Sequence, residues 1–207
     1  MLRVGLTGGL ASGKSFVGRA LADLGCHLIE ADQLGHEVLM PDAEAYEAVV
    51  REFGPGVLAP DGTVDRSRLA AEVFDRPDRL ATLNSLVHPP VIRREAEILK
   101  ELEARDPGGI AVMAAAILIE TGSYRRFDKI ILAVASPEQQ IERAIARGLS
   151  REKALARIER QMPLEEKRKY ADYVIDTSGQ KEDTLRQVRE VYRALGGRPT
   201  PSRSVPR

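Results

Sequence analysis

One eight-residue stretch near the start of the chain constrains the fold more than any other feature. Residues 8–15 read Gly-Gly-Leu-Ala-Ser-Gly-Lys-Ser and match the pattern G-x-x-x-x-G-K-[ST] in full. Residues 2–7 before the stretch are typical of a short buried strand, and apolar side chains recur at helical spacing over residues 16–24. Because backbone N–H groups and the helix dipole both favour an anion at a helix N-terminus, the pattern predicts a nucleotide-binding P-loop.

The residue types within this loop predict how a nucleoside triphosphate would be held. Gly8 and Gly13 permit backbone conformations that a side chain would block. Lys14 can reach the β- and γ-phosphates and is a predicted catalytic residue, and the Ser15 hydroxyl can ligate Mg²⁺. ATP and Mg²⁺ are therefore the expected cofactors. The expected nucleotide-binding residues of the loop are Gly8, Gly9, Leu10, Ala11, Ser12, Gly13, Lys14, Ser15 and Phe16.

The composition argues against several other classes of protein. Lysine and arginine together number 31, as do aspartate and glutamate, so net charge favours neither nucleic acid nor membrane binding. Cys26 is the only cysteine, which excludes an internal disulfide and suits a reducing compartment. We expect the first residues to form a strand rather than a signal peptide, and no apolar run approaches 18 residues. We expect a soluble cytoplasmic enzyme with a small-molecule substrate; the sequence carries no indication of oligomeric state.

The second strand is expected at residues 26–30, and the carboxylate of Asp32 follows it. In parallel sheets, ligands bind beyond the carboxyl ends of the strands, so Asp32 is expected near Ser15 and the phosphates. There it could take part in catalysis. The alternative is that Asp32 is the N-cap of a helix over residues 33–40, and capping and catalysis can coexist.

The later part of the chain alternates between strands and helices. Residues 110–119 are ten consecutive apolar residues, typical of a central parallel strand. Further strands are expected at 129–135 and 172–176, and an amphipathic helix follows the last of them. This alternation predicts an α/β fold with a P-loop NTPase core, in which helices flank a parallel sheet.

Residues 33–105 carry no convincing strand. Helices are expected at 42–53, 65–74 and 77–87, and Pro89-Pro90 is expected to open a longer one. Such a stretch within an α/β chain predicts a helical insertion that binds the second substrate. The expected organisation is a kinase core (1–32 and 106–196) with a helical lid at about 137–170, the acceptor-binding insertion (33–105) and a flexible tail (197–207).

The predicted lid is strongly basic. Arg143 and Arg147 are four residues apart, which places them on one helix face with Gln140, and Arg157 follows on the next helix. Positive charge on a segment that closes over a transferring phosphoryl group is typical of kinases. We predict Arg143 and Arg147 as catalytic residues and Arg157 as a nucleotide-binding residue. The alternative is that these arginines lie on solvated helix faces.

Taken together, the motifs over about residues 2–195 resemble those of the dephospho-coenzyme A kinase family. Each motif is short, but the ordered set is specific. The resemblance rests on Thr7-Gly8-Gly9 with the P-loop, Ala31-Asp32, Asp61-Gly62 with Asp65-Arg66, Leu83-Asn84 with His88-Pro89, Ile117-Leu118-Ile119-Glu120 with Gly122, and the segment from Gln161-Met162 through Lys167 and Ala171-Asp172 to Ile175-Asp176.

The resemblance implies a fold and a reaction. Members join a P-loop kinase core to a helical coenzyme A-binding domain and a lid, and they transfer the γ-phosphate of ATP to the ribose 3′-hydroxyl of dephospho-coenzyme A. By position, Asp32 corresponds to the carboxylate that takes the hydroxyl proton and helps to hold Mg²⁺. Asn84 and His88 fall in the acceptor-binding domain, and the three arginines fall in the lid region that meets phosphates.

The chain departs from the family pattern at Ala114, where an acidic residue is usual. Alanine offers no oxygen, so Mg²⁺ would depend on Ser15, Asp32, phosphate oxygens and water. Either Glu30 or Glu120 compensates for the missing carboxylate, or the alanine leaves the enzyme weak, and we expect the second, reduced activity. Three other functions are alternatives to a dephospho-coenzyme A kinase. They are another small-molecule kinase acting on nucleosides or nucleotides, a nucleotide-dependent switch, and a nucleotide-binding relative with impaired catalysis.

Overall fold

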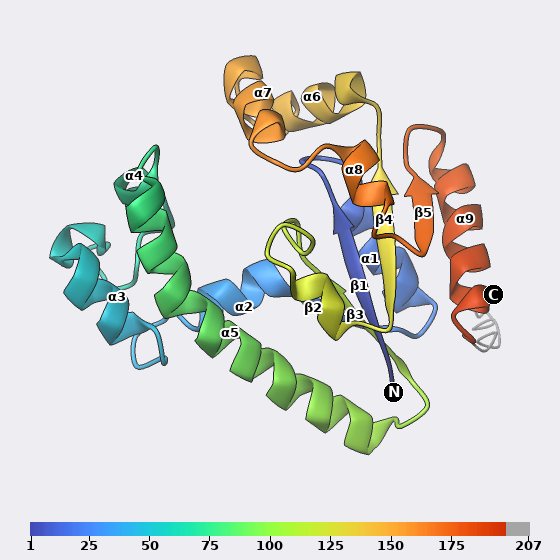
Figure 1. Ribbon diagram of the computed structural model, residues 1–207, viewed down its shortest axis with the longest axis horizontal. Coiled ribbons are helices and arrows are strands. Elements are labelled where there is room, and N and C mark those ends of the chain that lie inside the picture. The colour runs from blue at the N-terminus through green and yellow to red at the C-terminus, as the bar shows by residue number, and fades with distance from the viewer. Residues whose placement is uncertain (198–207) are drawn as a thin grey trace, which may run out of the picture. The chain divides into compact units, whose positions relative to one another are not determined.

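The structure is a computed structural model that describes residues 1–197. It contains a sheet with the strand order β2-β3-β1-β4-β5 (Figure 1). β1 pairs in parallel with both β3 and β4, and β4 pairs in parallel with β5. The predicted α/β fold with a parallel sheet is confirmed. The strand bounds are β1 (Leu2–Gly8), β2 (His27–Glu30), β3 (Ile110–Ala114), β4 (Lys129–Val134) and β5 (Tyr173–Asp176).

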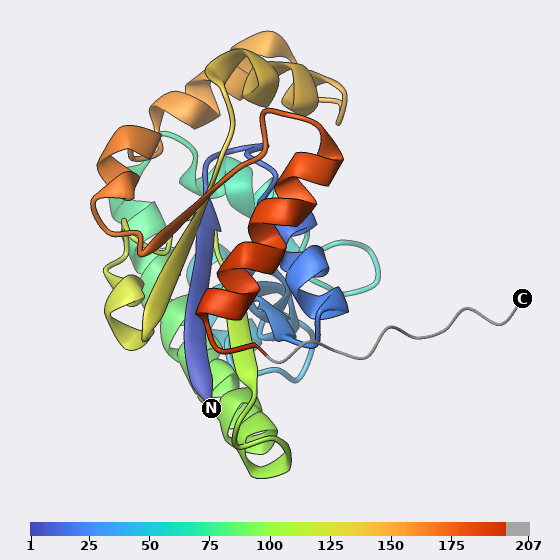
Figure 2. The same cartoon turned by 90° about the vertical axis from the view of Figure 1, so that its right-hand side faces the viewer.

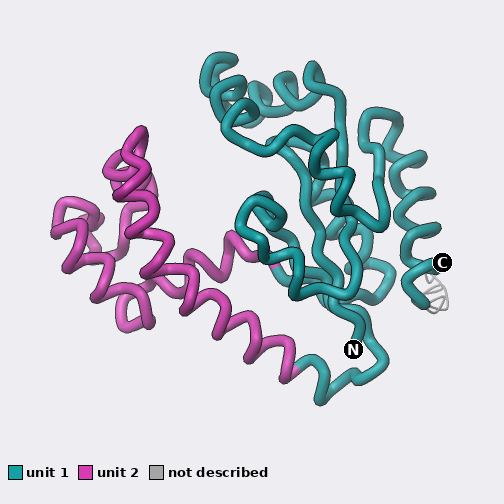
Figure 3. Tube along the Cα trace, viewed as in Figure 1, with its two compact units in different colours: residues 1–29, 102–207 teal, residues 30–101 magenta. Residues whose placement is uncertain are grey.

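The chain divides into two compact units, which Figure 3 distinguishes by colour. The first unit comprises residues 1–29 and the chain from Leu102 onward, and it contains the P-loop. The second unit is Glu30–Glu101. The predicted role of residues 33–105 in acceptor binding stays a prediction. Of the predicted tail at 197–207, all but Gly197 lies outside the described residues.

Helices cover both faces of the sheet in the first unit. α1 and α9 pack together on one face, and α8 lies against β4 on the other (Figures 1 and 2). α6 and α7 lie beyond the carboxyl end of β4. The bounds are α1 (Lys14–Asp23), η2 (Ser123–Arg126), α6 (Pro137–Ile145), α7 (Arg151–Glu159), α8 (Leu164–Arg168) and α9 (Lys181–Ala194).

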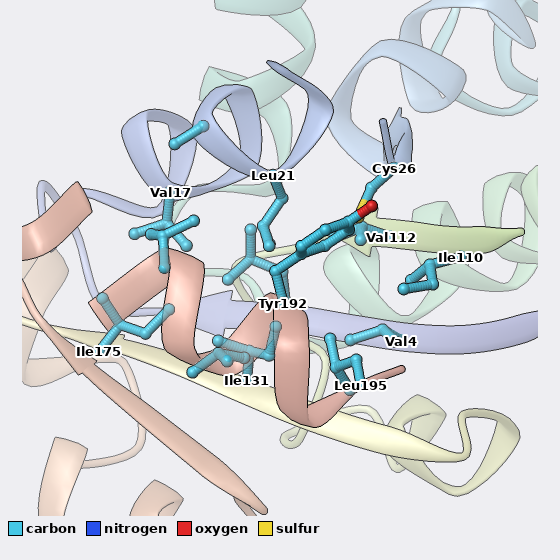
Figure 4. Close-up of a cluster of buried hydrophobic side chains, with 14 of the residues drawn as sticks. Val4, Val17, Leu21, Cys26, Ile110, Val112, Ile131, Ile175, Tyr192 and Leu195 are labelled. Atoms are coloured by element: carbon cyan, nitrogen blue, oxygen red, sulfur yellow. The ribbon is translucent and has the colours of Figure 1, made fainter. Parts of the chain in front are cut away.

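The main core lies between the sheet, α1 and α9 (Figure 4). Val4 and Leu6, alternate residues of β1, are fully buried there with Leu21 of α1. Burial of such side chains contributes roughly 1.5–3 kcal/mol each. Cys26 lies in the same cluster, and desolvation raises the pKa of its thiol to about 12. The thiol is therefore protonated and serves as an apolar core group.

β3 is shorter than its sequence predicts. The strand ends at Ala114, whereas the apolar run continues to residue 119. Ala115 still donates a backbone hydrogen bond to Leu6, but the carbonyl of Ala116 accepts from the side chains of Thr7 and Lys167. The predicted strand over 110–119 is wrong beyond Ala114 because these side chains replace the sheet partners.

Asp172, just before β5, ties that strand to β4. Its carboxylate accepts hydrogen bonds from the Lys129 ammonium and from the backbone N–H of Ile130, each at 2.8 Å. Partial burial opposes the charged form, but these two donors and the charge of Lys129 hold the pKa of Asp172 below its usual range. The contact fixes the start of β5, whose carboxyl end leads into the candidate site.

The second unit is helical and has its own core. Val49 and Val57 are buried at its centre, with Phe53 and Leu69 around them. α3 begins at Tyr46 rather than at the predicted residue 42, since Asp42 adopts a left-handed conformation (φ 66°) that interrupts a helix. The bounds are α2 (Ala31–Glu37), α3 (Tyr46–Phe53), η1 (Pro55–Val57) and α4 (Arg66–Val73).

α5 (Pro77–Arg105) is one helix of 29 residues and runs from the second unit into the first. The predicted break between residues 87 and 89 is wrong, because Pro89 and Pro90 lie inside the helix. Proline removes an N–H group but its φ is helical, and Val87 and Val91, on either side, both pack on the second unit's core. No helix in the described part of the chain has an apolar stretch long enough to cross a membrane.

Candidate functional site: the P-loop and the helices around it

The P-loop joins β1 to α1 and has the geometry of an anion cradle. Gly13, the N-cap residue of α1, has a left-handed φ of 84°, which favours glycine. A Cβ atom on Gly8 would overlap Ser12 Oγ and lie 2.7 Å from the carbonyl oxygen of Ala133. The predicted need for glycine at these two positions therefore has a physical cause in the structure.

Several polar groups of this loop have no protein partner. Within residues 1–197, the backbone N–H groups of Gly13, Lys14 and Ser15 donate to no protein acceptor, and Ser12 Oγ is buried without a hydrogen bond. A buried polar atom without a partner is costly, and helix N-terminal N–H groups attract anions. The loop thus fits a bound phosphate. Lys14 is the first residue of α1 and so lies at the same helix N-terminus.

The residues present also fit Mg²⁺ bound together with a nucleotide. Ser15 is exposed at the start of α1 and carries a hydroxyl oxygen. Among the described residues, no three His, Cys, Asp or Glu side chains gather into a metal site. An ion here would take most of its ligands from phosphate oxygens and water, as Mg²⁺ does in kinase sites.

Arg143 contacts the P-loop through Thr177. Its guanidinium donates to Thr177 Oγ1 (3.0 Å) and to the Thr177 carbonyl (2.6 Å). The Thr177 hydroxyl donates in turn to the carbonyl of Ser12 at 2.9 Å. The buried Thr177 therefore links a basic residue of α6 to the loop, and Arg143 is the predicted lid arginine that the structure brings to the P-loop.

Arg147 and Arg157 are both exposed. α6 ends at Ile145, so Arg147 lies in the following turn. The prediction that Arg143 and Arg147 share a helix face with Gln140 is therefore wrong for Arg147, because the helix stops before it. Arg157 is in the last turn of α7, where the helix dipole favours a positive charge. Their roles at phosphate stay predictions.

Two glutamines bind the backbone of Leu10 in the P-loop. Gln140 on α6 donates through Nε2 to the Leu10 carbonyl at 2.8 Å. The N–H of Leu10 donates to Gln161 Oε1, also at 2.8 Å. A cavity of about 460 Å³, a size that suits a small molecule, has Gly9, Gln140 and Gln161 among its lining residues. Sequence reasoning assigned no function to either glutamine.

A fully buried lysine lies close to this region. Lys167 on α8 has no exposed side-chain surface, and its ammonium contacts Glu120 Oε1 at 2.7 Å and the Ala116 carbonyl at 3.0 Å. Glu120 Oε1 also accepts from the backbone N–H of Met162 at 3.2 Å. The pair joins the loop after β3 to the α7–α8 connection. Lys167 and Glu120 belong to the family motifs, but the sequence itself does not predict a buried ion pair.

Lys167→Met is expected to destabilise the protein strongly. Removing one partner of a buried pair costs about 3–5 kcal/mol, and we expect the lower end because the Glu120 side chain is 23% exposed. Chemical denaturation measures the change. Lys129→Met, which breaks the more exposed pair with Asp172, is the matched control and should cost much less. Equal losses of unfolding free energy in the two variants would contradict the assignment of Lys167 and Glu120 as a buried, stabilising ion pair.

The remaining predicted residues belong to the second unit. Asp32 is the second residue of α2 and is exposed. Glu30 is the N-cap residue, so the alternative of Asp32 as an N-cap is wrong; Asp32 lies in the first turn, where negative charge favours the helix dipole. Asn84 and His88 are half-buried on α5, four residues apart and so on one face. Their binding roles stay predictions.

Ala114 is the last residue of β3 and is 2% exposed. It pairs with Leu6 and packs in the main apolar core. The small apolar side chain suits these surroundings, where a carboxylate would lose its hydration. The effect of Ala114 on Mg²⁺ binding and activity stays a prediction.

Comparison with known proteins agrees with the site. A model of the dephospho-CoA kinase family matches residues 2–183. The dephospho-CoA kinase of Aquifex aeolicus is 40% identical over 94% of this chain and 98% of its own, and that of Geobacter sulfurreducens is 41% identical over 91% and 96%.

Two solved structures have the same fold over nearly the whole chain. The crystal structure of TT1252 from Thermus thermophilus superposes with a TM-score of 0.81 at 34% identity, covering 93% of this chain and 96% of that one. Dephospho-CoA kinase from Campylobacter jejuni gives 0.70 at 26% identity, with the same coverage. The P-loop geometry, the parallel sheet and the match over residues 2–183 together lead to one conclusion: the chain belongs to the dephospho-CoA kinase family.

Proposed function

We propose that this chain transfers the γ-phosphate of ATP to the ribose 3′-hydroxyl of dephospho-CoA, and that it does so in the cytoplasm. The observation that carries the proposal is the P-loop itself, where the N–H groups of Gly13, Lys14 and Ser15 point to no protein acceptor within the described residues. Family membership over most of the chain supports the choice of acceptor.

In this proposal the P-loop binds the triphosphate and fixes its direction. Within residues 1–197 these N–H groups donate to no protein acceptor, so they are available to phosphate oxygens without prior rearrangement. Lys14 neutralises charge that develops between the β- and γ-phosphates. Bound Mg²⁺, held through Ser15 and Asp32, would screen phosphate charge. The loop residues act chiefly by positioning the phosphates.

Asp32 is the proposed catalytic base. It is exposed, and it lies two residues beyond the end of β2 in a sheet whose strands run parallel where pairing is defined. Its carboxylate would accept the proton of the acceptor hydroxyl as the oxygen attacks the γ-phosphorus. The bond from the γ-phosphorus to the bridging oxygen breaks, and ADP leaves.

The basic α6–α7 region is proposed to cover the phosphates. Arg143 already contacts Thr177 next to the loop, and Arg147 and Arg157 are exposed on the same region. Guanidinium groups pair well with phosphate oxygens, and closure would exclude water. Asn84 and His88 are proposed to contact the acceptor from the second unit.

A coupled assay that detects ADP tests the acceptor. With ATP and Mg²⁺, dephospho-CoA should give a kcat/KM on the order of 10²-fold or more above adenosine or a nucleoside monophosphate, because remote parts of a substrate contribute to the transition state. Equal turnover of a nucleoside monophosphate would favour a nucleotide kinase. ATP binding without transfer to any acceptor would favour a switch or an impaired relative.

A further inference from the structure

The two glutamines that bind Leu10 form a feature that the proposed chemistry does not use. We call Gln140, Gln161 and the backbone of Leu10 the glutamine clasp. It satisfies both backbone polar groups of Leu10. Gln140 of α6 donates to the Leu10 carbonyl, and Gln161, which follows the C-cap residue of α7, accepts from the Leu10 N–H, each at 2.8 Å. A backbone held at both its donor and its acceptor has little rotational freedom.

The Gln140 side of the clasp is buried and closely fitted. Gln140 is 3% exposed, so its amide depends on the protein for hydrogen bonds. A Cβ atom on Gly9 would lie 2.6 Å from Gln140 Nε2. The second glycine of the loop therefore leaves room for Gln140 to reach the carbonyl of the next residue. This gives Gly9 a role separate from phosphate contact.

The Gln161 side is held by the buried ion pair. Met162, the next residue, donates its N–H to Glu120 Oε1, and that oxygen pairs with the ammonium of Lys167. The backbone that carries Gln161 is thus fixed to the loop after β3. A side chain on a fixed backbone loses less conformational entropy when it binds its partner.

The clasp also divides the N–H groups of the loop between two tasks. Leu10 donates to Gln161, and Ser12 donates to the carbonyl of Gly9. The N–H groups left for phosphate are those around Gly13, Lys14 and Ser15. The protein therefore shapes the first half of the loop with its own side chains, and the second half receives the ligand.

We propose that Gln140 and Gln161 are positioning residues for ATP, which hold the P-loop in its phosphate-binding shape before the nucleotide arrives. The proposal rests on the proposed use of ATP. Preorganisation strengthens binding because the ordering cost is met during folding. Loss of the clasp should then weaken ATP binding and leave the binding of the acceptor unchanged.

Gln140→Met and Gln161→Met test this in the full-length protein. Methionine keeps the length of the side chain but has no amide. Calorimetric titration with ATP and Mg²⁺, without acceptor, should show that the ATP Kd of each variant is about 3–10-fold higher than that of the wild type. This is the effect of losing one hydrogen bond. The KM of dephospho-CoA should change less than about 2-fold. Gln180→Met, at an exposed glutamine before α9, is the control and should match the wild type.

The double variant gives the sharpest result. Both glutamines act on the same residue, so the loss of ATP-binding free energy in the double variant should be smaller than the sum of the losses in the two single variants. Full additivity, an unchanged ATP Kd in folded Gln161→Met, or an effect confined to the acceptor's KM would overturn the proposal. Because Gln161 is only half-buried, that variant keeps the test valid where Gln140→Met fails to fold. A wild type that binds no ATP would overturn the proposed function as well; a wild type that binds ATP but phosphorylates no dephospho-CoA leaves the Kd comparison as the test of the clasp.

Discussion

Lys14→Met is expected to lower the rate of phosphoryl transfer on the order of 10²–10³-fold, the usual effect of removing one charge-stabilising donor from an active site. Lys14 is the first residue of α1 and is half-buried, and it is not part of the main core cluster. The substitution keeps the length of the side chain, so the fold should persist while the charge beside the β- and γ-phosphates is lost.

Steady-state kinetics with ATP and dephospho-CoA measure this effect, and circular dichroism checks the fold. Lys181→Met, at an exposed lysine that begins α9, removes the same charge far along the chain and serves as the control. Near-normal turnover by a folded Lys14→Met protein would show that the loop does not act as a P-loop.

Asp32→Asn is expected to reduce transfer on the order of 10²–10⁴-fold, the range for loss of a general base. Asparagine has the same shape but cannot accept the proton of the attacking hydroxyl. Because Asp32 is exposed and is not the N-cap residue of α2, the melting temperature should change little. ATP should still bind, since the P-loop is intact.

The matched control is Asp78→Asn, which makes the same change in the first turn of α5 within the second unit. It should leave turnover unchanged. Single-turnover experiments with saturating ATP separate the chemical step from binding. A fall in stability with unchanged turnover per bound ATP would identify Asp32 as a structural residue.

Local patterns made the P-loop and the sheet predictable. Residues 8–15 are adjacent in the chain, so their spacing alone specifies a strand, a tight turn and a helix start. The apolar run at residues 110–119 likewise indicated a strand buried on both faces and hence a parallel sheet, although β3 itself ends at Ala114. The motif order was sufficient to indicate the family, because short motifs in a specific sequence order rarely coincide by chance.

Some errors arose where local rules compete with packing. Pro89 and Pro90 usually mark a helix boundary, yet α5 continues through them because apolar residues on both sides pack on the same cluster. The end of β3 was misplaced for a related reason. Apolar residues follow Ala114, but their backbone is bound by side chains from elsewhere in the chain.

By itself, the sequence determined the phosphate-binding loop, the parallel α/β core and the family. Tertiary structure alone decided which polar side chains support that loop. Gln161 lies 151 residues from its partner Leu10, and Lys167 lies 51 residues from the carbonyl that it binds. A lysine or glutamine in a short charged segment resembles a surface residue in any local pattern. Its burial and its partner depend on distant segments brought together by hydrophobic packing, and that information is absent from spacing along the chain.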